Sequence, residues 1–183
     1  RLGITLYAGA QLKAYSYADE THSIEFDFKG ERRLHSSRWF VDATGRNSFL
    51  KRRFGLQEKV LHKANAVWWR IRSEMNVDDW GKGEKWREGF DGLKSRRLST
   101  NHFMGKDYWV WVIPLAGGYT SLGIVGDAPC VSLDRLSTLE GAMEWLLEHE
   151  PYIAPLITEG EVLDYRVLKS FAHSCGRVFS PDR

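Results

Sequence analysis

The chain has 183 residues, of which 43% are hydrophobic and 27% charged, the balance of an ordinary globular protein with room for one or two domains. Its net charge of +2 is too small to indicate a nucleic acid or a membrane surface as a partner. The two cysteines form no C-x-x-C pair, which argues against a disulfide scaffold and favours a reduced, cytoplasmic setting. The six histidines lack the spacing of a metal site, and no apolar run has the length of a membrane helix.

Residues 1–42 are predicted to form a β-meander. Within it, residues 23–28 alternate apolar and polar side chains with a period of two, the pattern of a half-buried strand. Glycine and charged residues at 29–31 predict a turn, and the apolar run at 38–41 predicts one more buried strand. This part of the chain is therefore expected to be all β.

A tight turn and a helix over residues 46–54 are predicted to follow. Gly45 permits a backbone conformation or a close approach that a Cβ atom would block. Asn47 or Ser48 is expected to cap the helix, and Gly55 to end it. The free N–H groups at the start of a helix form a natural anion site, but a plain strand-to-helix connection explains the same residues equally well.

The middle of the chain combines two strands with a long loop. Residues 65–72 and 98–104 have the apolar and β-branched content of strands. The loop at 74–95 is polar, with a helical turn predicted near 77–80, and it either folds over the sheet as a lid or forms a cluster of its own. Its large aromatic side chains are Trp80, Trp86 and Phe90. His102 in the second strand is interpreted as structural in preference to an acid or base.

The clearest pattern is a β-hairpin around the glycines at 117–118, between two runs of aromatic and β-branched residues. Side chains alternate along its first strand, so Trp109, Trp111 and Ile113 share one face. Both faces are apolar. One is expected to pack on a core, and the other on a second layer, a cofactor or a substrate. Pro114 lacks an N–H group and is expected to end the strand pairing.

The C-terminal part predicts a helix, a short second helix and a last strand. The S-x-x-E sequence from Ser137 to Glu140 has the form of a capping box and opens a helix that runs to about residue 149. Residues 153–157 are predicted as the short helix and residues 161–171 as the strand. The expected fold class is α+β, with a mostly antiparallel β-sheet and one or two covering helices.

Two segments resemble motifs of one group of flavoproteins. The order W-x-W-x-I-P resembles a motif of flavin-dependent halogenases and related FAD-dependent monooxygenases, and its positions here are Trp109, Trp111, Ile113 and Pro114. The order D-A-T-G-R resembles the second flavin-contacting motif of p-hydroxybenzoate-hydroxylase-like FAD proteins, and its positions here are Asp42, Ala43, Thr44, Gly45 and Arg46. Thr44 stands where the aromatic hydroxylases carry aspartate, which favours the halogenase-like branch.

The resemblance implies a role for each part of the chain. Residues 1–56 would be the C-terminal part of a Rossmann-like FAD-binding domain, a remnant made of the meander, a strand and a helix. Residues 57–176 would be an antiparallel-sheet substrate domain, and residues 177–183 would return toward the FAD-binding domain. The D-A-T-G-R segment would line the FAD site, with Arg46 at a phosphate or at the edge of the pocket. The indoles of the other motif would stand between the flavin and the substrate.

The resemblance thus implies an internal fragment of an FAD-dependent oxidoreductase with a small organic substrate and a separate flavin reductase among its partners. No catalytic acid, base or nucleophile is assigned within the chain, because the chemistry belongs to the flavin. Two alternatives stay open. One is a flavin enzyme that hydroxylates, or that reduces as geranylgeranyl reductases do, without halogenating. The other is a non-enzymatic, tryptophan-rich β domain that binds a ligand. The flavin hypotheses require both motifs to border a single flavin chamber.

Overall fold

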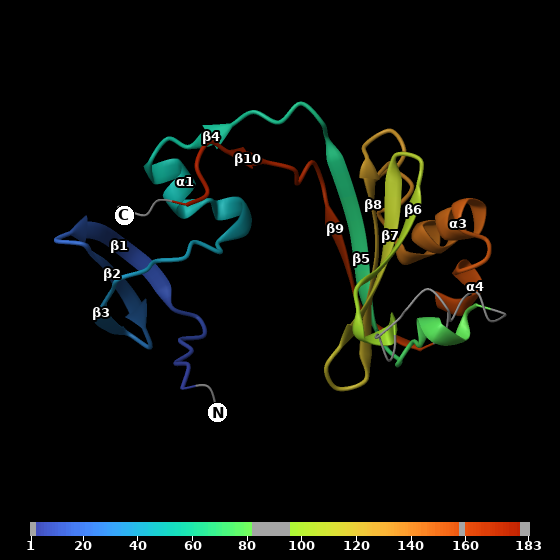
Figure 1. The fold of residues 1–183 in the computed structure, drawn as a ribbon, viewed down its shortest axis with the longest axis horizontal. Helices are drawn as coiled ribbons and strands as arrows, with labels where there is room; N and C mark the ends of the chain where they lie inside the picture. The colour runs from blue at the N-terminus through green and yellow to red at the C-terminus, as the bar shows by residue number, and fades with distance from the viewer. Residues whose placement is uncertain (1–2, 82–95, 158–159, 180–183) are drawn as a thin grey trace. The chain divides into compact units, whose positions relative to one another are not determined.

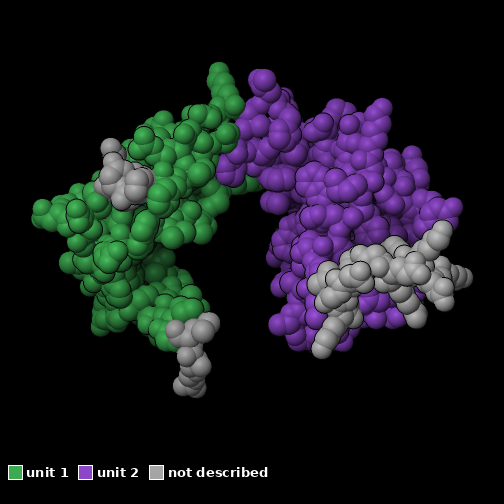
Figure 2. Space-filling view, in the orientation of Figure 1, with its two compact units in different colours: residues 1–59, 174–183 green, residues 60–173 purple. Residues whose placement is uncertain are grey.

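The computed structural model describes residues 3–81, 96–157 and 160–179, and the chain divides into two compact units. Unit 1 consists of the two ends of the chain, up to Lys59 and from Ser174 onward, and unit 2 is the part between them (Figure 2). Unit 2 is therefore an insertion into unit 1. The predicted α+β class is confirmed, because antiparallel sheets dominate and helices are few among the described residues.

A three-stranded antiparallel meander begins unit 1, in the order β1-β2-β3 (Figure 1). Its strands are β1 (Gln11–Ala18), β2 (Thr21–Phe28) and β3 (Glu31–Ser37). The connecting turns place Asp19 and Gly30 at positive φ. The Tyr15 hydroxyl lies 2.9 Å from Nδ1 of His22, and both side chains are buried. The predicted meander is thus confirmed.

The apolar run at 38–41 does not form the additional buried strand that was predicted. Its backbone is irregular, and Trp39 and Val41 are 57% and 83% exposed. Phe40 packs its ring against Tyr15, with 5.1 Å between the centroids. A strand needs a neighbour that satisfies its N–H and C=O groups, and no described strand pairs with these residues.

The helix predicted over residues 46–54 is shorter than expected and interrupted. A 3-10 turn, η1 (Gly45–Asn47), precedes a single helical turn, α1 (Phe49–Arg53). Ser48 separates them because its φ of 47° and ψ of 50° are left-handed. Gly55 ends the helix as predicted, with a φ of +63° that glycine adopts without strain.

Two short strands from opposite ends of the chain close unit 1. They are β4 (Gln57–Glu58) and β10 (Ser174–Cys175), and they pair antiparallel. Nζ of Lys51 donates to the Ser174 carbonyl at 3.2 Å, and the Ser174 hydroxyl donates to the Glu58 carboxylate at 3.3 Å. The segments on either side of the insertion are therefore hydrogen-bonded to each other.

A five-stranded antiparallel sheet forms the centre of unit 2, in the order β6-β7-β8-β5-β9 (Figure 1). The strands are β5 (Ala64–Arg72), β6 (Asn101–Gly105), β7 (Tyr108–Leu115), β8 (Tyr119–Asp127) and β9 (Glu161–Leu168). The short 3-10 turns are η2 (Val77–Asp79) and η3 (Arg96–Leu98). The helices are α3 (Leu139–His149) and α4 (Ala154–Ile157), and they cover one face of the sheet (Figure 1). The predicted hairpin, flanking strands and helices are confirmed.

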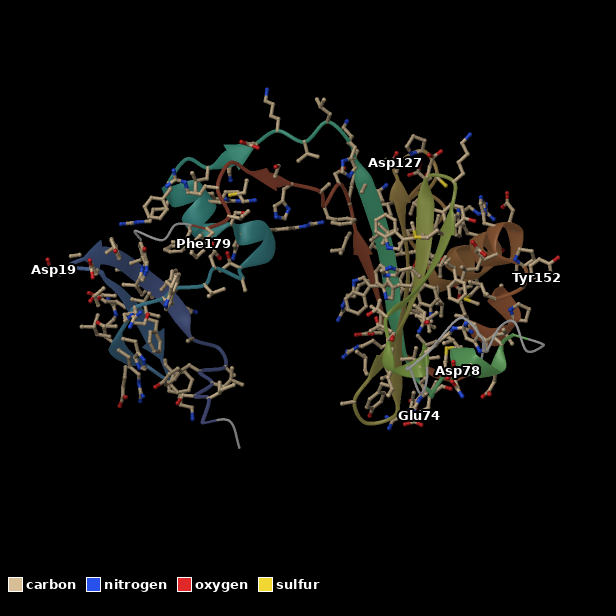
Figure 3. All side chains as sticks on the ribbon, viewed as in Figure 1. Asp19, Glu74, Asp78, Asp127, Tyr152 and Phe179 are labelled. Carbon is tan, nitrogen blue, oxygen red and sulfur yellow. The ribbon has the colours of Figure 1, made fainter. Side chains whose placement is uncertain are left out.

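The core of unit 2 lies between the sheet and the two helices. Alternate side chains of each strand point into it, and those buried on β5, β7 and β8 are Val67, Trp69, Ile71, Val110, Val112, Leu122 and Ile124. Trp145 and Leu146 of α3 complete the core from the other side. Side chains fill the space between the sheet and the helices. Tyr152, between α3 and α4, lies outside this core and is 90% exposed (Figure 3).

Two predictions about the ends of elements are wrong. The pairing of β7 with β8 continues past Pro114 to the end of the strand. The missing N–H group is tolerated because β6 already ends opposite Val112, which leaves that edge of β7 open beside the proline. Helix α3 is capped by Thr138 rather than Ser137, since the Thr138 hydroxyl accepts from the N–H group of Gly141 at 3.2 Å.

The loop that follows β5 is described only at its ends. Trp80 stacks on Phe103 with 5.7 Å between the ring centroids. Trp86 and Phe90 lie outside the described residues, so the lid and cluster interpretations stay predictions. In the described part of the chain, no group of acidic, histidine and cysteine side chains could hold a metal ion. None of the described helices is long and apolar enough to cross a bilayer.

Candidate functional site

The first group of predicted site residues, 42–46, lies in unit 1 between the meander and α1. One carboxylate oxygen of Asp42 accepts hydrogen bonds from the N–H group and the hydroxyl of Thr44, at 2.9 and 2.5 Å. The other oxygen accepts from the N–H group of Leu50 at 2.7 Å. The Thr44 hydroxyl in turn accepts from the N–H group of Phe49 at 3.1 Å. Asp42 and Thr44 together cap α1.

This arrangement replaces the cap that was predicted from Asn47 or Ser48. Ser48 occupies the cap position, but its hydroxyl donates to the Gly45 carbonyl at 3.0 Å and does not cap the helix. The negative charge expected at the start of the helix is supplied by the chain itself, through Asp42. The N–H groups of α1 that Asp42 and Thr44 bind are therefore not available to an external anion.

The hydrogen bonds around Asp42 favour its ionised form. Partial burial by itself raises the pKa of this carboxyl group. The hydrogen bonds from Thr44 and Leu50 and the charge of Lys51 outweigh that effect, so the pKa lies below the ordinary value for aspartate. Asp42 is thus a fixed structural anion that holds the neighbouring turn in place.

Residues 43–46 form an exposed strip of backbone next to this anion. Gly45 has a φ of +57°, and nothing lies within 4 Å of the place where a Cβ atom would stand. Glycine is therefore required here for its backbone conformation and not for space. The carbonyl groups of Thr44 and Gly45 accept hydrogen bonds from the N–H groups of Asn47 and Ser48, so the turn is held internally, and α1 does not fit as a phosphate site.

The second group lies on β7 of unit 2. Trp109, Trp111 and Ile113 are half-buried and point to the face of the sheet opposite α3 and α4, as the alternation predicts. Val110 and Val112 point the other way and are buried in the core. No described element of unit 2 covers the face that carries the tryptophans, so it is a candidate binding surface.

One row of opposed residues crosses this face from one edge of the sheet to the other. In the order of the strands, the row consists of His102, Trp111, Gly123, Trp68 and Arg166. Trp68 and Trp111 are half-buried and flank a glycine, and His102 is exposed at the end of the row. We name the centre of this surface the tryptophan face, defined as Trp68, Trp109, Trp111, Ser121 and Gly123.

Two arginines of β5 continue this face of the sheet beyond the tryptophans. Nε of Arg70 lies 3.1 Å from both carboxylate oxygens of Asp164 on β9, and its Nη2 lies 2.6 Å from one of them. Nε of Arg72 lies 3.0 Å from the carboxylate of Glu161. The hydrogen bond from Arg70 holds the pKa of Asp164 below its ordinary value. Both guanidinium groups are paired with carboxylates of β9, which argues against their recognising an acidic ligand.

Sequence reasoning identified the tryptophan pair but missed its partners on β8. Ser121 lies opposite Ile113, and Gly123 lies opposite Trp111. The sequence predicted a turn at 117–118, and a two-residue turn there would place Ile124 opposite Trp111. The observed loop has three residues, 116–118, with Leu115 opposite Tyr119, and this register places Gly123 opposite Trp111.

The two groups of site residues belong to different units. Residues 42–46 lie in unit 1 and the tryptophan face lies in unit 2. That both groups border one flavin chamber stays a prediction, as do the domain boundaries near residues 56 and 176.

Comparison with known proteins places this fold in a class. No family model matches the chain. The chain is 27% identical over 164 residues to the flavin-dependent halogenase chlA of Dictyostelium discoideum, a match that covers 82% of this chain and 25% of the halogenase. A flavoprotein/dehydrogenase from Cytophaga hutchinsonii has the same fold, with a TM-score of 0.62 and 18% identity over 94% of this chain and 39% of its own. The halogenase PltM, solved with phloroglucinol and FAD, matches with a TM-score of 0.58 and 16% identity over 88% of this chain and 32% of its own.

The fold is therefore one shared with FAD-dependent flavoproteins. Within that class, the sequence is similar to a flavin-dependent halogenase, which confirms the resemblance predicted from the two motifs. The chain spans 25% of the curated relative and 39% and 32% of the two solved proteins, so it corresponds to a part of each.

Proposed function

We propose that the complete protein is an FAD-dependent oxidoreductase of the halogenase-like monooxygenase group that acts on a small organic substrate. The observation that carries the proposal is the sequence similarity to a flavin-dependent halogenase over 82% of the chain. The shared fold supports it. FAD supplies the redox chemistry when it is bound, and the residues of this chain bind, orient and exclude water.

The tryptophan face is the proposed wall of the substrate pocket. Trp109 and Trp111 would stand between the flavin and the substrate, where their bulk would exclude water. Ile113 and Pro114 would continue this wall toward the end of β7. Half-buried indoles suit a flat, uncharged ring, because aromatic rings prefer stacked or edge-on contacts.

Residues 42–46 are the proposed flavin contact from unit 1. Asp42 and Thr44 hold the turn, and residues 43–45 are exposed beside it. Arg46 is exposed and is proposed to lie at a phosphate or at the edge of the pocket.

Substitution of Trp111 in the complete protein tests the proposal. Trp111→Ala should change the flavin fluorescence or uncouple flavin oxidation from substrate conversion. Trp80→Ala is a matched control, because Trp80 is also half-buried but stacks on Phe103 at the core side of the sheet. The control should leave the flavin spectrum unchanged. Unchanged spectra and turnover in Trp111→Ala would assign the tryptophans to the sheet alone.

A flavin enzyme that hydroxylates or reduces without halogenating is the second candidate, favoured by the shared fold with a flavoprotein/dehydrogenase. Turnover of the complete protein with a flavin reductase, with and without halide, separates the two candidates by the mass of the product. A complete protein that binds no FAD would leave the third hypothesis, a non-enzymatic, tryptophan-rich β domain.

The 183-residue chain on its own should bind FAD weakly, because the exposed turn at 43–46 offers few contacts and the cap residues occupy N–H groups of α1. Flavin fluorescence quenching measures this affinity. Sub-micromolar binding by the isolated chain would contradict the proposed division of the FAD site.

A further inference from the structure

The ring of Trp111 lies against the backbone of β8. Trp111 is directly opposite Gly123 in the β7–β8 ladder. A Cβ atom added to Gly123 would overlap Cζ2 of Trp111 and would lie 2.5 Å from its Cε2. Side chains essentially never approach a Cβ atom this closely, so the indole occupies the space that any larger residue would fill. Gly123 is buried beneath it.

A hydrogen bond fixes the rotation of the same ring. Nε1 of Trp111 donates to Oγ of Ser121 at 3.3 Å. Ser121 is two residues from Gly123 on β8 and therefore points to the same face. The terminal torsion of a tryptophan side chain is broad, so packing and hydrogen bonds must select one orientation. Gly123 therefore sets the height of the indole above the sheet, and Ser121 sets the rotation of the ring.

Gly123 lies at the centre of the tryptophan face. It lies between Trp111 and Trp68 in the row across the sheet, and the Trp111 ring covers it. Trp109 stands two residues along β7 on the same face. The Trp111 indole thus fills the position over the glycine at the centre of the tryptophan face.

We propose that Ser121 and Gly123 are positioning residues, which hold the Trp111 indole flat on the sheet so that its outer face forms part of the proposed wall of the substrate pocket. The inference rests on the proposed function, in which Trp111 lines that pocket. A larger residue at 123 would lift the ring, and loss of the hydroxyl at 121 would let it rotate. The contacts also stabilise the sheet, since an aromatic ring over a glycine protects a weak point of a strand. The test must therefore read ligand binding and not stability alone.

The experiment titrates the ¹⁵N-labelled 183-residue chain with 2-naphthol, a flat and uncharged probe, and follows the indole N–H resonance of Trp111. The loss of that resonance in Trp111→Phe assigns it. We expect a saturable shift in the unchanged chain. In Ser121→Ala and Gly123→Ala the resonance should move, and the affinity should fall about threefold to tenfold, the size expected for one aromatic contact. Ser121→Thr keeps the hydroxyl and should restore the affinity.

Two controls separate the outcomes. Ser23→Ala removes a hydroxyl hydrogen bond from the meander and should change neither the resonance nor the affinity. If Gly123→Ala does not fold, the comparison of Ser121→Ala with Ser121→Thr carries the test. Folded variants that bind 2-naphthol within twofold of the unchanged chain would overturn the inference. If Trp111→Ala also binds normally, the proposed role of Trp111 in the pocket fails as well; if only Trp111→Ala loses binding, the positioning inference alone is overturned.

Discussion

Removal of the Asp42 carboxylate should release the turn that precedes α1. In Asp42→Ala, the N–H groups of Thr44 and Leu50 lose the acceptors that lie 2.9 and 2.7 Å away. Loss of a helix cap costs about 1 kcal/mol. The second hydrogen bond contributes about 1 kcal/mol more. The expected loss is therefore about 2 kcal/mol of local stability, roughly a thirtyfold change in the opening equilibrium of α1.

Amide hydrogen exchange of the segment from Thr44 to Phe54 measures this opening directly. Leu50 should exchange roughly thirty times faster in Asp42→Ala than in the unchanged chain. Asp42→Asn is the matched variant, because asparagine keeps one acceptor oxygen and should show about a fivefold effect. Ser48→Ala removes the hydroxyl that does not cap the helix and should have a smaller effect than either. Equal exchange in Asp42→Ala and the unchanged chain would show that Asp42 does not hold the turn.

Acid should have the same effect as the substitution. The pKa of Asp42 lies below its ordinary value in the folded chain, so its contribution to stability is complete above the unfolded-state pKa of about 3.9. It is lost as the pH falls through the folded-state pKa. Protection of Leu50, corrected for the intrinsic exchange rate, should therefore fall in acid for the unchanged chain and should fall less for Asp42→Ala. Parallel pH profiles would contradict this assignment.

Three further predictions concern unit 2 and are checked by urea denaturation. Thr138→Ala should lower the free energy of unfolding by about 1 kcal/mol, whereas Ser137→Ala should leave it unchanged; the reverse order would restore Ser137 as the cap. Gly141→Ala should destabilise, although alanine normally favours a helix, because the new Cβ atom would overlap the carbonyl oxygen of Arg135; a higher midpoint would refute this packing. Tyr108→Phe should cost about 1 kcal/mol and remove a titration near pH 12, because burial raises the pKa of this tyrosine to about 12. If the titration that is lost in Tyr108→Phe lies near pH 10, the burial of Tyr108 would be contradicted.

The sheet of unit 2 was predictable because its signals are local and repeated. The glycines at 117–118 predict one hairpin, and alternation along β7 correctly separates the core side chains from those on the other face. The capping signal before α3 was correct in kind and wrong by one residue, because Ser137 and Thr138 are both good caps and only the backbone conformation selects one. Local chemistry therefore predicts elements better than their ends.

The errors in unit 1 arise where a long-range partner decides the structure. Apolar content at 38–41 predicts burial, but a strand also requires a neighbour, and Trp39 and Val41 are exposed. The cap of α1 comes from Asp42, eight residues before the N–H group of Leu50 that it binds. Capping rules search the three or four residues around a helix start and do not reach that far.

The sequence predicted the residues of the two motifs, but not the residues of β8 that contact Trp111. Both motifs could be found from the sequence because they are short runs with a characteristic order. The glycine beneath Trp111 and the serine that receives its N–H group come from the next strand, so no single run of the sequence contains the complete surface.

The pairing of β4 with β10 brings the two ends of unit 2 next to each other. Glu58 of β4 lies opposite Ser174 of β10. A two-residue turn between them would convert both strands into a hairpin and leave unit 1 without its insertion. By the same geometry, a different sheet could be grafted between these two strands with its own recognition surface. Such an exchange would replace unit 2 and leave the β4–β10 pairing unchanged.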